Sequence, residues 1–172
     1  MNHSKLDELN ACREAVDWCS DFGTLQEAWD KCERGDWMLW YLGQTCGATE
    51  TDSHRTMTAC KAACARLVLH IWEAKYPDDA RPKLAIEAAE KYSRGEITAS
   101  ATSASADSAA DAADDAADDA ASAASAAYSA AASASAAWSA AWDAAGDAAW
   151  DAARFAMLKQ CAEEIRKIVP TI

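Results

Sequence analysis

Residues 98–153 read TASATSASADSAADAADDAADDAASAASAAYSAAASASAAWSAAWDAAGDAAWDAA, and this stretch decides the fold class. It consists almost entirely of Ala, Ser and Asp, with no Pro and a single Gly. Alanine is the strongest helix former, and polar residues recur here every three or four positions, which is the period of a helix. The series runs through Asp107, Asp111, Asp115, Asp118, Ser122, Ser125, Ser129 and Ser133. The pattern predicts a long helix or a helical hairpin with one polar face.

The rest of the chain predicts shorter helices and no sheet. Apolar periodicity and helix start and stop signals place them over residues 4–20, 24–34, 37–42, 54–75, 82–94 and 154–169. In the last helix the expected core face consists of Phe155, Leu158, Ile165 and Ile168. We predict an all-α fold, a compact helical bundle of about five to seven helices including the long Ala/Ser/Asp-rich one. One domain is expected over 1–172, with short aromatic- and Cys-rich helices in 1–95 and long Ala-rich helices in 98–169.

Individual residues mark the ends of these helices. Thr24 begins a capping-box pattern, Thr-Leu-Gln-Glu. We expect Gly35 just past the C-terminus of the helix that Thr24 opens. Asp36 should then cap the apolar helix 37–42, which must be buried or line an interface because it is apolar on every side. Gly95 is expected to end the helix 82–94.

Charge is divided unevenly along the chain, which has a net charge of −12. Residues 1–53 hold four Lys or Arg against eleven Asp or Glu, and residues 54–95 hold eight against five. Residues 98–153 contain nine Asp and no basic residue. This balance disfavours direct binding to nucleic acid or to an anionic membrane surface. An anionic ligand would be expected at the middle segment.

The chain carries no pattern of a targeting segment, a membrane span or a metal site. The first ten residues are polar, and the alanine run is interrupted by Asp too often to span a bilayer. Seven cysteines without a Cys-x-x-Cys pattern indicate reduced thiols that serve mainly as small apolar residues. Cys60 and Cys64 could hold a metal from one helix face, but core packing explains their spacing better. We predict a cytoplasmic protein with no metal and no cofactor.

Eight tryptophans are many for 172 residues. Trp37 and Trp40 fall on one side of the short helix 37–42, and Trp138 and Trp142 are one helical turn apart. Such clusters can stack a nucleobase. The alternative is that large indoles fill space opposite small alanines. Both interpretations remain open for each tryptophan.

Three arginines are candidates for binding phosphate. Arg81 stands at a predicted helix N-terminus, where backbone N–H groups also attract anions. Arg66 and Arg94 could extend this basic surface. The structural alternative is that Asp78 and Asp79 cap the helix and pair with Arg81.

No catalytic motif stands in the sequence. The run of Asp residues between 111 and 119 could imitate the phosphates of a nucleic acid, but it covers too few helical turns for a duplex mimic, and solubility explains it better. Carboxylates on an exposed helix are also poorly placed for acid–base chemistry, which needs a cleft that shifts their pKa values. His54 and His70 belong to no nucleophile motif. We therefore expect no enzyme.

Two segments carry a resemblance to known families. The segment EAWDKCERGDWMLW at 27–40 resembles a signature of Ala-rich helical proteins from bacteriophages. The segment 64–96, with CARL, PDDARP, AIEAA and RGE, is similar to a bacterial family described as immunity proteins. This resemblance implies a binding role and brings no catalytic residues. The bacterial family often has histidines in its alanine-rich half, and this chain has none there.

These observations favour a phage-encoded, non-enzymatic binding protein of the host cytoplasm that forms a homo-oligomer. The leading hypothesis is sequestration of a small anionic, nucleotide-derived immune signal. Its ligand-binding residues would be Trp37, Trp40, Arg66, Arg81, Arg94, Trp138 and Trp142. The alternative is an immunity or anti-defence protein that inhibits a host defence protein through its acidic Ala-rich face.

Overall fold

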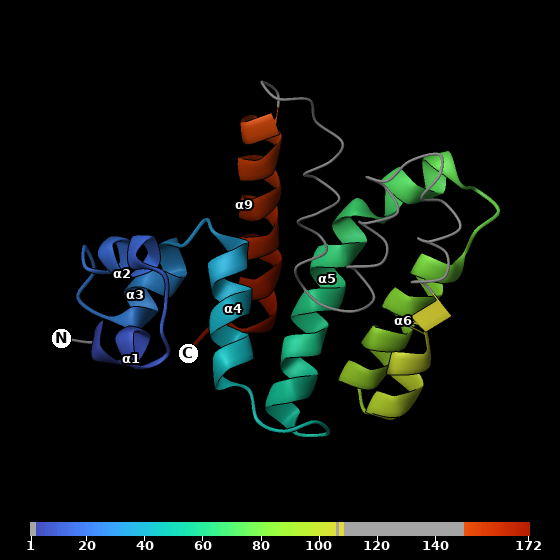
Figure 1. The fold of residues 1–172 in the computed structure, drawn as a ribbon, viewed down its shortest axis with the longest axis horizontal. Helices are drawn as coiled ribbons and strands as arrows, with labels where there is room; N and C mark the ends of the chain where they lie inside the picture. The colour runs from blue at the N-terminus through green and yellow to red at the C-terminus, as the bar shows by residue number, and fades with distance from the viewer. Residues whose placement is uncertain (1–2, 106, 109–149) are drawn as a thin grey trace.

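The computed structural model describes residues 3–105, 107–108 and 150–172, and these residues form helices with no strand among them (Figure 1). The helices are α1 (His3–Glu8), α2 (Arg13–Cys19), α3 (Leu25–Lys31), α4 (Gly35–Thr45), α5 (Asp52–Lys75), α6 (Arg81–Ser93) and α9 (Trp150–Ile168). The prediction of an all-α fold is confirmed. Residues 99–105 are helical, but most of the predicted long Ala-rich helix lies outside the described residues.

Helix α5 lies between α4 and α9 on one side and α6 on the other (Figure 1). The main core forms where α4, α5 and α9 meet. Its buried members are Trp29, Cys32, Met38, Leu39, Cys60, Cys64, Cys161, Ala162 and Ile165. Cys60 and Cys64 are 0% exposed, so they serve as core residues, as their spacing predicted. Small thiols let three helices approach one another closely at this point.

The opposite face of α5 is built mainly from alanine and packs against α6. Ala62, Ala65 and Leu69 of α5 are buried with Ile86 of α6. Small side chains allow the two helix backbones to lie close together, although each alanine removes little apolar area from water. Beyond Ser93, Gly95 takes a positive φ of 77° and ends α6, as predicted.

Gly35 has a different role from the one predicted. It does not follow the end of α3, which finishes at Lys31, but begins α4 and is buried against α9. A Cβ on Gly35 would lie 2.5 Å from the Cβ of Cys161 and 2.9 Å from the carbonyl oxygen of Leu158. The absence of a side chain therefore allows α4 to cross α9 in close contact. Asp36 lies inside α4 and does not cap it, and the helix continues to Thr45.

The N-terminal helices differ from the single helix predicted over 4–20. The chain leaves α1 at Asn10, whose φ is 59°. The Asn10 N–H bonds to the Asp7 carbonyl at 3.0 Å and the Ala11 N–H to the Leu6 carbonyl at 2.9 Å. These bonds close the helix in the Schellman arrangement, with Asn in the position usually taken by Gly. The capping box at Thr24, by contrast, is present as predicted.

The C-terminal segment attaches α1–α3 to the bundle. The Trp29 indole Nε1 donates to the Val169 carbonyl at 2.9 Å, and the Ile172 N–H donates to the Gln26 side chain at 2.8 Å. Arg166 of α9 donates to the carbonyls of Cys32 and Trp29. A cation is favourable there because it faces the carbonyl end of α3.

The predicted core face of α9 is partly wrong. Leu158 and Ile165 are buried, at 2% and 0% exposure, but Phe155 and Ile168 are 60% and 37% exposed. Cys161 and Ala162 complete the buried face instead. Small residues occupy the middle of α9 because α4 crosses it there at Gly35.

Candidate functional site

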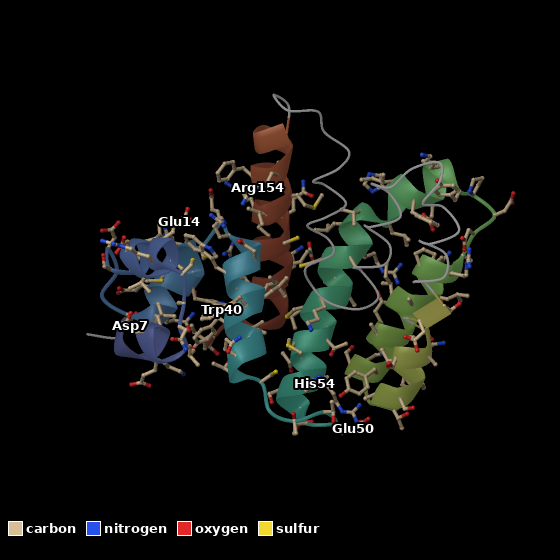
Figure 2. All side chains as sticks on the ribbon, in the orientation of Figure 1. Asp7, Glu14, Trp40, Glu50, His54 and Arg154 are labelled. Carbon is tan, nitrogen blue, oxygen red and sulfur yellow. The ribbon has the colours of Figure 1, made fainter. Side chains whose placement is uncertain are left out.

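An aromatic pocket lies between α1–α3 and α4. Its volume is about 430 Å³ and its walls are mainly apolar. The side chains that matter for its chemistry are Glu14, Trp18, Arg34, Asp36, Trp37, Trp40 and Tyr41. In Figure 2, Trp40 lies on the side of α4 that faces the N-terminal helices. We call this hollow the aromatic pocket.

Three half-buried tryptophans, Trp18, Trp37 and Trp40, form much of the aromatic surface of the pocket. The rings of Trp18 and Trp37 lie 5.9 Å apart with their planes tilted by 57°, so two helices supply one aromatic wall. Trp40 is one turn further along α4. No described group accepts a hydrogen bond from the indole N–H of Trp18, Trp37 or Trp40. These three indoles therefore offer apolar faces together with donors available to an incoming group.

The charged groups of the pocket form one cluster at Arg34. Its guanidinium donates to both carboxylate oxygens of Asp36, at 2.9 and 2.7 Å, and contacts Glu14 at 3.3 Å. It also lies over the Trp37 ring, 4.3 Å from the ring centroid. Hydrogen bonding to Asp36 raises the pKa of Arg34. Among the described lining residues Arg34 is the one cation, and two carboxylates face it.

Burial shifts two of the thiols that line the pocket, Cys19 and Cys32, toward their protonated form. Burial raises the pKa of Cys32 to about 11, and burial also raises that of Cys19. A protonated, buried thiol is unreactive at neutral pH. Within the described chain, no group of three His, Cys, Asp or Glu residues could hold a metal ion.

A second polar cluster joins the loop before α5 to the end of α6. The Tyr92 hydroxyl, on a side chain only 1% exposed, accepts from the Glu50 N–H at 2.9 Å and lies 2.9 Å from His54 Nδ1. Arg55 lies 4.8 Å from the centroid of the Tyr92 ring and donates to the Tyr92 carbonyl at 2.7 Å. Glu50 also accepts from the Ala99 N–H at 2.6 Å. Each of these contacts fastens one segment to another, which indicates a structural role.

The residues predicted to bind a ligand do not share one site. Trp37 and Trp40 line the aromatic pocket. Arg66 lies on α5. Arg81 and Arg94 lie at opposite ends of α6, and the rise per residue of a helix puts them roughly 20 Å apart along its axis. Helix α5 separates α6 from α4 (Figure 1).

Each of the three arginines has a carboxylate partner. Arg66 pairs with Glu90 at 2.6 Å, Arg81 with Asp79 at 2.8 Å, and Arg94 with Glu96 at 2.6 Å. Hydrogen bonding to Arg81 lowers the pKa of Asp79. Of the alternative interpretation, the pairing of Asp79 with Arg81 is present, but the N-cap residue is Ala80 and not Asp78 or Asp79.

Sequence reasoning did not select five of the pocket residues named above as ligand-binding: Glu14, Trp18, Arg34, Asp36 and Tyr41. Arg34 carried a usable signal, since it precedes Trp37 by three residues and Asp36 by two. Trp18 is far from α4 in sequence, so only the fold brings it to Trp37. Trp138 and Trp142 lie outside the described residues, and ligand binding at any of these positions stays a prediction.

Comparison with known proteins identifies the family of the chain. Residues 47–167 match the family described as "Imm-5 like putative immunity protein". This chain belongs to that family. No curated protein and no solved structure matches it significantly. The family description agrees with the resemblance seen in segment 64–96. In the described parts of the chain, no helix has both the length and the apolar character needed to cross a bilayer.

The matched range excludes the whole lining of the aromatic pocket. That lining comes from residues 6–41 and from Ile172, while the match covers α5, α6 and most of α9. Among the described residues, the matched range therefore corresponds to α5, α6, the segment after α6 and most of α9. The pocket lies between α1–α3 and α4, all of which precede the matched range.

Proposed function

We propose that this chain is a non-catalytic immunity protein that inhibits a protein partner by binding it, with the aromatic pocket as the centre of the contact. The pocket is the observation that carries the proposal. Tryptophan and arginine contribute most of the energy at protein interfaces, especially when they line a partly desolvated hollow. Here three half-buried tryptophans and one arginine surround an apolar volume of about 430 Å³.

Family membership supports a protein as the partner. The location of the pocket outside residues 47–167 supports a role in choosing that partner, because a shared framework can carry different contact residues in its added segment. Inhibition by occupancy needs no chemistry from this chain. The net charge of −12 would speed association with a basic partner.

Sequestration of a small anionic, nucleotide-derived signal is the second candidate. The pocket volume falls within the range of ligand sites, roughly 300 to 1,000 Å³, and its indoles could stack a base. The charges argue against this function. Arg34 is engaged by Asp36 and Glu14, so a phosphate entering the pocket would meet two carboxylates. Assembly into a homo-oligomer and origin from a phage stay predictions.

The experiment is native mass spectrometry of the protein purified from its host cells, for the wild type and Trp40→Ala. We expect a stoichiometric protein partner with the wild type, reduced about tenfold or more by Trp40→Ala because a truncated hot spot costs at least one decade of affinity. Phe155→Ala is the matched control, since it removes an exposed aromatic ring from α9. Expression of the recovered partner alone should arrest growth, and co-expression of this chain should restore it.

Two results would contradict the proposal. A small molecule in the native spectrum without a protein would favour sequestration. A partner that binds wild type and Trp40→Ala equally would remove the pocket from the interface.

A further inference from the structure

The aromatic pocket has the composition of a cation site. Ring faces carry negative potential, and Trp is the aromatic residue that holds a cation best. Trp18, Trp37 and Trp40 supply three such rings to one hollow. Its apolar walls would also cover the carbon stem of a long basic side chain.

The fixed charges of the pocket point the same way. Glu14, Arg34 and Asp36 are the charged side chains of the lining, so two carboxylates against one guanidinium leave an excess of one negative charge. Asp36 is half-buried at 23% side-chain exposure, whereas Glu14 is 72% exposed at the rim. Attraction inside a partly desolvated hollow is screened less than on an open surface. A cation is therefore favoured over an anion here.

The pocket wall already holds one cation of this kind. Arg34 lies 4.3 Å from the Trp37 centroid while its nitrogens bond to Asp36. Lys5 of α1 lies over another ring of α4, 5.5 Å from the Tyr41 centroid. The Arg34 contact shows that a ring and a carboxylate of α4 lie at a spacing that one guanidinium can bridge.

We infer that the aromatic pocket takes an arginine side chain from a basic protein partner. The inference rests on the proposed function, since it names the chemistry of the partner that the function requires. The guanidinium would lie against the indole faces of Trp37 or Trp40, with Glu14 at the rim. Backbone carbonyls of the partner would accept hydrogen bonds from the indole N–H groups.

The test uses the full chain and the capped tripeptide acetyl-Gly-Arg-Gly-amide, with the citrulline tripeptide as its uncharged match. Binding is followed by the indole N–H signals in ¹H–¹⁵N NMR spectra, assigned with Trp37→Phe and Trp40→Phe. We expect saturable shifts of both signals with the arginine peptide. Affinity for the citrulline peptide should be weaker by about fivefold or more, because it lacks the charge that the rings and carboxylates attract.

Glu14→Gln tests the rim without touching the core. This substitution should lower the affinity for the arginine peptide by about threefold, as expected for an exposed charge. Glu33→Gln is its control, because Glu33 is similarly exposed, at 65%, but pairs with Lys159 of α9. Equal binding of the arginine and citrulline peptides, tighter binding of a glutamate peptide, or no shift at Trp37 and Trp40 would overturn the inference.

The two proposals fail separately. If a protein partner is lost on Trp40→Ala while the arginine peptide causes no shift, the proposed function stands and the arginine inference is wrong. If the arginine peptide binds but no partner depends on Trp40, cation selectivity of the pocket stands and the proposed function is wrong.

Discussion

At the scale of single residues, Tyr92 joins α6 to the segment at the start of α5. Its buried hydroxyl is the partner of the Glu50 N–H and of His54 Nδ1. Tyr92→Phe should lower the free energy of unfolding by about 1 to 3 kcal/mol, because these two groups would lose their partner while staying partly buried. Urea unfolding measures the change.

The control for Tyr92 is Tyr41→Phe on α4. Tyr41 is half-buried, and its hydroxyl has no hydrogen-bond partner among the described residues, so the ring alone contributes and little stability should be lost. Equal losses for the two substitutions would mean that the hydroxyl of Tyr92 contributes nothing specific.

At the scale of elements, the crossing of α4 over α9 depends on one missing side chain. Gly35→Ala should destabilise the protein by about 1 to 3 kcal/mol, because the new Cβ would overlap Cys161 and the Leu158 carbonyl of α9 and force the helices apart. Thermal or urea unfolding tests this prediction.

Gly43 on the same helix provides a control, because its replacement by alanine should not lower the free energy of unfolding. Its added Cβ would meet only the Met57 sulfur, at 3.9 Å, which is an ordinary contact. Gly43→Ala should therefore be neutral or stabilise by up to about 1 kcal/mol, since alanine is the better helix former. Destabilisation of similar size at both positions would show that backbone conformation, and not the approach of α9, decides the cost.

At the scale of the whole molecule, the pocket exists only while α1–α3 stay attached to the bundle. Arg166 contributes to this attachment by donating to the carbonyls at the end of α3. Arg166→Met keeps an apolar stem and removes the donor, so the amides of α2 and α3 should exchange hydrogen faster while those of α5 and α6 keep their protection. Hydrogen exchange followed by mass spectrometry resolves the two regions.

Lys167→Met is the matched control on α9. Lys167 is exposed and pairs with Glu164 on its own helix, so its loss should leave α2 and α3 unchanged. Faster exchange throughout the molecule on Arg166→Met would mean that the N-terminal helices and the bundle unfold as one unit.

Local signals in the sequence predicted most of the described elements. The capping box at Thr24, the helix over 54–75 and the termination at Gly95 depend on interactions within a few residues, so the sequence contains the information. The end of α1 at Asn10 also depends on local interactions, but the sequence did not predict it because the apolar pattern continues past this residue. The family resemblance of segment 64–96 was likewise readable, since it depends on order along the chain.

The sequence by itself determined that this protein is helical, where most of its helices begin and end, and that Trp37 and Trp40 share a side of one helix. Only the tertiary structure decided which faces are buried. Gly35 is buried because α4 crosses α9 there, whereas Phe155 of α9 is exposed. The aromatic pocket also belongs to the tertiary structure, because Trp18 and Trp37 meet only after α1–α3 dock on the bundle. Burial depends on which elements meet in space, and periodicity along one helix carries no information about that.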